Sequence, residues 1–100
     1  MTRNYATEAK VTKNNVLTLL EEIEETRNSD RLLLVRYWER FDNVSMTNFE
    51  ETFLNGATPA ETITRARRSV QSGGLFPPTN PDVARKRGIR QEEARQYHAG

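Results

Sequence analysis

Two helical segments of this 100-residue chain, 47–54 and 58–71, follow each other with almost no linker. Thr47 and Glu50 have the spacing of a capping box, in which each side chain accepts a hydrogen bond from a free backbone N–H of the first turn. The same spacing recurs at residues 58–61, with a proline at the first helical position. Two short helices joined this tightly must turn sharply on one another, which predicts a helix-turn-helix.

Apolar residues upstream of this pair recur at helical spacing and predict two more helices, over about 13–26 and 30–42. The second of them is apolar over much of its circumference and is expected to be the most buried element. The fold class predicted is all-α, a helix-turn-helix or winged-helix-like bundle of four to five helices. Its expected core comprises Leu20, Ile23, Leu33, Tyr37, Phe53, Ile63, Ala66 and Val70.

The chain divides into three parts by pattern. Residues 1–11 lack periodicity and are expected to be a flexible N-terminal arm. Residues 12–78 are expected to form the helical domain, and residues 79–100 a basic tail helix that is partly mobile. Pro77-Pro78 cannot donate to a strand ladder, so the β-wing of a winged helix is expected to be degenerate or absent. Leu75 and Phe76 are instead expected to fold back on the core.

Charge is distributed unevenly along a chain whose net charge is only +1. Residues 1–56 hold 7 Arg and Lys against 10 Asp and Glu, a net of −3, whereas residues 57–100 hold 8 against 4, a net of +4. Clustered positive charge is the usual electrostatic footprint of phosphate binding. The C-terminal half is therefore the candidate site for double-stranded DNA.

The basic segment 58–71 has two faces when it is placed on a helix. Ile63, Ala66 and Val70 share the side that must pack, which leaves Thr64, Arg65, Arg68 and Gln71 pointing outward and Thr62 and Arg67 flanking. Arginine forks onto guanine or phosphate, and threonine or glutamine can reach bases or backbone oxygens. The predicted DNA contacts are Thr62, Thr64, Arg65, Arg67, Arg68 and Gln71, with Arg85, Lys86, Arg87 and Arg90 from the tail.

Other functions stay open beside DNA binding. A protein-interaction module, in which the 47–71 unit docks an acidic partner, is the main alternative, and segment 30–42 leaves room for a homodimer interface. A catalytic site is not expected, because no nucleophile with a neighbouring base and no glycine-rich phosphate loop occurs. No cofactor or metal is expected either, since cysteine is absent and the single histidine, His98, has no ligand spacing around it.

The chain lacks an apolar run of about 20 residues and a signal-peptide core, which predicts a protein with no membrane segment. The absence of cysteine is typical of a reducing compartment, so a cytoplasmic location is expected.

Four sequence blocks resemble a known group of proteins. The blocks are ETRNSDRLLLVRYW at 25–38, FEETF at 49–53, ETITRARRSVQSGGLFPP at 61–78 and VARKRGIRQEEAR at 83–95. In this order they resemble small phage and prophage proteins of helix-turn-helix or winged-helix type, over residues 15–95. The resemblance implies a winged-helix-like fold and a phage or prophage context, with the host cytoplasm as the location. It implies no particular DNA target.

Overall fold

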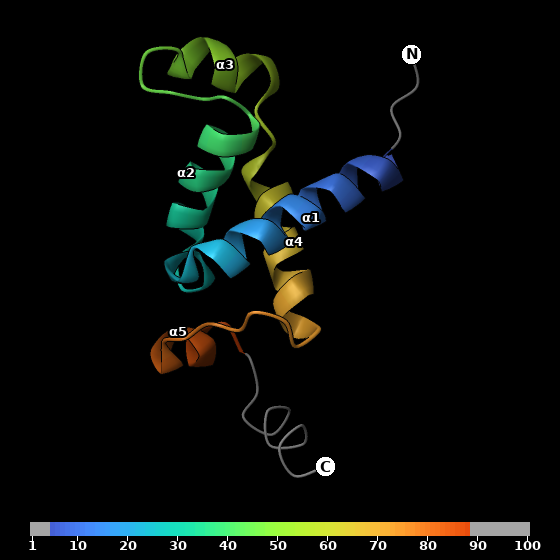
Figure 1. Cartoon of the computed structure of the whole chain (residues 1–100), viewed down its shortest axis with the longest axis vertical. Coiled ribbons are helices and arrows are strands. Elements are labelled where there is room, and N and C mark those ends of the chain that lie inside the picture. The colour runs from blue at the N-terminus through green and yellow to red at the C-terminus, as the bar shows by residue number, and fades with distance from the viewer. Residues whose placement is uncertain (1–4, 89–100) are drawn as a thin grey trace.

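The computed structural model describes residues 5–88, with side chains from residue 9 onward, and this part of the chain is all-helical (Figure 1). The elements are α1 (Tyr5–Glu22), a 3₁₀ turn η1 (Glu24–Arg27), α2 (Asp30–Phe41), α3 (Phe49–Gly56), α4 (Ala60–Ser72) and α5 (Pro81–Lys86). The all-α prediction is confirmed. No β-wing is present between residues 73 and 80, as the two prolines predict.

The predicted helix start near residue 13 is wrong, because α1 already begins at Tyr5, within the segment 1–11 that was expected to be an N-terminal arm. Residues 5–11 are rich in good helix formers such as Ala9 and Lys10, whose low conformational cost lets the helix extend beyond its apolar stripe. At the other end α1 stops at Glu22, four residues before the predicted end. The chain then tightens into η1, where the buried Thr26 hydroxyl donates to the Leu19 and Ile23 carbonyls.

Three helices build the core. α1 lies across α4, and α2 packs beside both (Figure 1). The buried apolar cluster comprises Val16, Leu19 and Leu20 of α1, Leu33 and Tyr37 of α2, and Ile63 and Val70 of α4. Ile23, Ala66 and Phe76 pack against this cluster at its margin. The expectation that α2 is the most buried helix is wrong, since two residues of α2 are buried but four of α4, and Val35 of α2 is 49% exposed.

α3 stands apart from this core, at the far end of α2 (Figure 1). Its backbone does not come within 8 Å, Cα to Cα, of any other helix in the described residues. Phe53, predicted as a core residue, is 36% exposed, and its aromatic contact with the body is an edge-on one with the Trp38 ring, with centroids 4.9 Å apart. The mutual packing of α3 and α4 that defines a helix-turn-helix is therefore not confirmed.

Neither predicted capping box forms. Thr47 hydrogen bonds to the Ser45 hydroxyl, and the cap position of α3 is taken by Asn48 without a side-chain bond. The Thr58 side chain turns to the carboxylate of Asp42, so Pro59 precedes α4 with no side-chain cap. In both cases the threonine hydroxyl that was predicted to cap a helix bonds another side chain instead, Ser45 in the loop or Asp42 at the end of α2.

Residues 43–57, called the arm below, leave and rejoin the body through a narrow neck. The Asp42 carboxylate accepts hydrogen bonds from the Thr58 backbone N–H at 2.8 Å and from its hydroxyl at 3.2 Å. The Trp38 indole N–H donates to the Thr58 carbonyl at 2.7 Å. Val44, the one buried residue of the arm, is joined to this neck by its backbone N–H, which donates to the Trp38 carbonyl at 3.0 Å. The neck sets where α4 begins and where the arm projects.

Candidate nucleic-acid interface

α4 is the helix on which the DNA hypothesis depends, and it is firmly built into the body. Ile63 and Val70 on its inner side are 0% and 2% exposed. Its C-terminal end is followed by Gly74 at φ 90°, a conformation that glycine adopts without steric cost. The prediction of an apolar inner face is confirmed, and the outer face is thereby held in one orientation.

Two of the predicted DNA contacts, Arg65 and Arg68, lie exposed on that outer face. Arg65 forms an ion pair with Glu61 one turn earlier, at 2.7 Å, with both side chains more than 70% exposed. A pair this exposed contributes little to stability and exchanges readily for another anion. Arg68 has no carboxylate partner among the described residues.

Thr62 and Thr64, also predicted contacts, are half-buried rather than freely exposed. The Thr64 hydroxyl donates to the Glu61 carbonyl at 3.3 Å, a bond within the helix itself. Their remaining exposed surface flanks Arg65 and Arg68.

Arg67 is placed differently from its two neighbouring arginines. It is 6% exposed, and its Nε and one terminal nitrogen donate to the two carboxylate oxygens of Asp30 at 2.9 and 2.8 Å. This forked geometry is the strong form of an arginine–carboxylate pair. The assignment of Arg67 as a DNA contact is corrected accordingly, because the guanidinium instead joins α4 to the start of α2.

Gln71 was predicted to point outward, which is wrong, since it is 3% exposed. Its amide nitrogen donates to the backbone carbonyls of Arg27 and Phe76 at 3.3 and 3.0 Å. Its amide oxygen accepts a hydrogen bond from Arg87 at 3.2 Å. Gln71 thus ties α4 to η1 and to the segment that follows α4.

Arg87 from the predicted tail completes the same internal network. Its guanidinium donates to the Arg27 carbonyl at 2.5 Å and lies 3.6 Å from the Asp30 carboxylate. Burial lowers the pKa of Arg87 below its ordinary value, and the nearby Arg67 charge lowers it further, while Asp30 acts in the opposite direction. Arg87 therefore anchors α5 to the body, and its predicted role as a DNA contact is wrong. We call Asp30, Arg67, Gln71 and Arg87 the polar junction.

The other predicted DNA contacts of the tail differ in their surroundings. Lys86 is exposed, and Arg85 is exposed but paired with Asp82 at 2.5 Å. Arg90 lies outside the described residues. α5 itself confirms the predicted tail helix over Pro81–Lys86, and it is fixed at its start by Asn80, whose side chain accepts a bond from the Asp82 N–H.

Two features at this site have no local signal in the sequence. In the sequence Asp30 has the position of an acidic residue at a helix start. Its ion pair with Arg67, 37 residues later, exists only in the folded structure and places Asp30 at the centre of the polar junction. Phe76 adopts φ 45°, which is unfavourable for a bulky side chain, and its ring lies 5.1 Å from the Arg27 guanidinium. A positively charged residue stacked on an aromatic ring is a tertiary contact that no periodicity predicts.

No helix of the described residues is both long and apolar enough to cross a membrane. Comparisons with protein-family models, with curated proteins and with solved structures gave no match to this chain. The resemblance to small phage helix-turn-helix proteins therefore stays a prediction.

Proposed function

We propose that this chain is a non-enzymatic DNA-binding protein of phage or prophage type. Its contact with the duplex is the outer face of α4, the second helix of the predicted helix-turn-helix. The observation that carries the proposal is that Arg65 and Arg68 stand exposed on a helix whose inner side is fully packed. A rigid helix that holds two guanidinium groups on one face can meet phosphates with little ordering cost.

The footprint proposed is smaller than the sequence suggested. Arg67, Gln71 and Arg87 are used inside the protein. Among the predicted contacts that the structure describes, the exposed cations are Arg65, Arg68, Arg85 and Lys86, of which Arg65 and Arg85 each pair with a carboxylate of the same helix. With two to four phosphates neutralised, the logarithm of the binding constant should fall with the logarithm of salt concentration at a slope of about −2 to −4. The affinity is expected to be modest at physiological salt.

The test is titration of the full chain with random duplex DNA at several salt concentrations. Replacing both Arg65 and Arg68 by alanine should weaken binding and make the slope shallower by about 2, while helical content stays unchanged. The matched control is Arg40→Ala, which removes another exposed arginine that pairs with Glu22 on the body. If the double variant binds as well as the parent, the proposal fails.

A second function, docking of an acidic protein partner, would use the same face of α4. The small number of exposed cations favours it, because affinity for a duplex depends on how many phosphates the protein neutralises. Absence of duplex binding by the parent chain, together with binding of an acidic peptide that is lost in the double variant, would replace the DNA proposal with this one.

A further inference from the structure

The arm carries the densest exposed apolar surface of the described residues. Seven large apolar side chains are more than a third exposed, and four of them lie in this short segment. Met46 is 94% exposed, Leu54 72% and Phe49 49%. Phe53, the fourth, is partly covered by its contacts with Trp38 and with Phe49, whose ring stacks on it at 5.1 Å. Exposed apolar side chains concentrated in one short segment are typical of an interaction site.

This surface is held in place although it is not buried. Asp42 and Trp38 fix the neck through Thr58, and the Asn48 side chain closes the loop before α3 by bonding the Ser45 N–H and the Asn43 carbonyl. The arm is thus preorganised, which lowers the cost of binding a partner.

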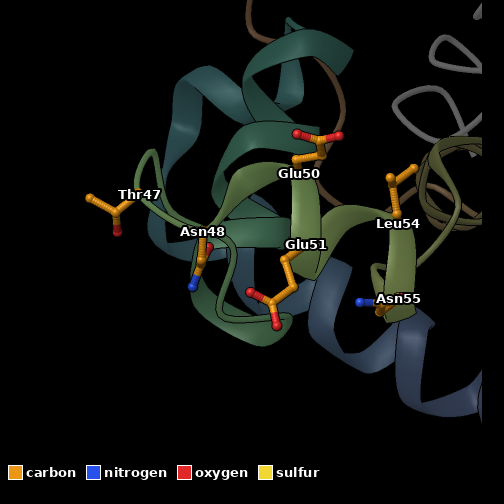
Figure 2. A pocket seen from close by; sticks show the side chains of 6 residues that line it. All are labelled: Thr47, Asn48, Glu50, Glu51, Leu54 and Asn55. Atoms are coloured by element: carbon orange, nitrogen blue, oxygen red, sulfur yellow. The ribbon is translucent and has the colours of Figure 1, made fainter.

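Charge restricts what the partner can be. The arm contains Glu50 and Glu51 and no lysine or arginine, and the nearest cations in the sequence are Arg40 and Arg65. Neither glutamate has a cationic partner in the part of the chain that the structure describes. Together with Leu54 they line a hollow of about 430 Å³ between α3 and the loop before it (Figure 2). A complementary ligand combines apolar groups with positive charge.

Other occupants fit this surface less well. A second copy docked arm to arm would bring Glu50 and Glu51 against their own equivalents, and like charges facing each other disfavour such a pair. A second copy docked through α4 would offer Arg65 and Arg68, but that face carries serines at 69 and 72 and no apolar anchor. Nucleic acid would be repelled by the carboxylates.

We propose that the arm binds a basic amphipathic helix of another protein. Its apolar side would cover Met46, Phe49 and Leu54, and its lysines or arginines would meet Glu50 and Glu51. Helix-in-groove recognition works through such spaced apolar anchors. The proposal is independent of DNA binding, because none of these residues lies on α4.

The test uses the full chain and a synthetic amphipathic peptide of leucine and lysine, with binding followed by fluorescence anisotropy and by backbone NMR shifts. A scrambled peptide of the same composition and a leucine–glutamate peptide are the controls. The leucine–lysine peptide should bind best and shift resonances of residues 43–57. Equal binding of all three peptides, or shifts confined to α4, overturns the proposal.

Variants locate the site. Met46→Ser with Leu54→Ser should weaken peptide binding about tenfold or more, and Glu50→Lys with Glu51→Lys should do the same. The matched control is Val11→Thr, which changes a 51% exposed apolar residue of α1 and should leave affinity unchanged. If the parent is instead a dimer in sedimentation and the serine variant is a monomer, a second copy occupies the arm and the proposal is wrong.

Discussion

α3 and α4 are adjacent in the chain and were predicted as one unit, yet α4 packs into the body and α3 does not. α4 buries Ile63, Arg67, Val70 and Gln71, whereas no residue of α3 is buried. α4 presents cations to solvent, and α3 presents apolar groups and carboxylates. Similar end signals in the sequence therefore lead to a structural helix in one case and an exposed helix in the other, and the difference lies in what each helix finds to pack against.

The largest expected effect is on the buried side of α4. Ile63→Ala should lower the free energy of unfolding by about 3–4 kcal/mol, because it opens a cavity at a fully buried site. Leu54→Ala on α3 should change it by less than about 0.5 kcal/mol, since that side chain is 72% exposed. Urea titration measures both values. A large loss from Leu54→Ala would mean that the arm is part of the core.

The second effect separates the arginines of α4. Arg67→Ala removes a forked ion pair and leaves Asp30 with Arg87 as its remaining cation in the polar junction, which should lower the free energy of unfolding by about 2–3 kcal/mol. Arg68→Ala should cost less than about 0.5 kcal/mol. Thermal unfolding of the two variants tests the assignment, and equal midpoints would show that Arg67 is not held as described.

The neck between the two helices provides a smaller effect. Asp42→Ala removes both hydrogen bonds to Thr58 and should cost about 1–2 kcal/mol. Amide hydrogen exchange should quicken in residues 43–57 more than in α1. Asp42→Asn, which retains an acceptor oxygen, is the control and should lie between the parent and the alanine variant. Uniform quickening across the chain would contradict a local role for the neck.

The smallest effect concerns the outer face of α4. Glu61→Gln releases Arg65 from an exposed ion pair, and stability should change by less than about 0.5 kcal/mol. Under the proposed function, duplex affinity should rise slightly and its salt dependence should steepen, because one more cation faces the phosphates. An unchanged or weaker affinity would count against Arg65 as a contact.

The agreement between sequence and structure follows the range of the interactions involved. α2 and α4 lie within two residues of their predicted bounds, because helical periodicity is a property of neighbouring residues. The burial of Leu20, Leu33, Tyr37, Ile63 and Val70 follows from the same periodicity and is confirmed. Phe53 has equally good spacing, but no helix approaches its side of α3 closely enough to bury it.

The candidate site was predictable only in part. Arg65 and Arg68 are exposed as the helical wheel predicts, whereas Gln71 is not. On the wheel Gln71 lies at the edge of the apolar face, where local geometry permits either direction. The choice is made by acceptors on η1 and at Phe76, which supply hydrogen bonds that a buried amide requires.

By itself the sequence determined an all-helical chain, an apolar inner face on α4 and a concentration of positive charge in the C-terminal half. These depend on residue type and on spacing within a few turns. Only the tertiary structure decided which cations remain at the surface and which helix stays uncovered. Asp30 lies far from Arg67 and Arg87 in sequence, and burying an arginine is favourable only where folding brings such a carboxylate to it.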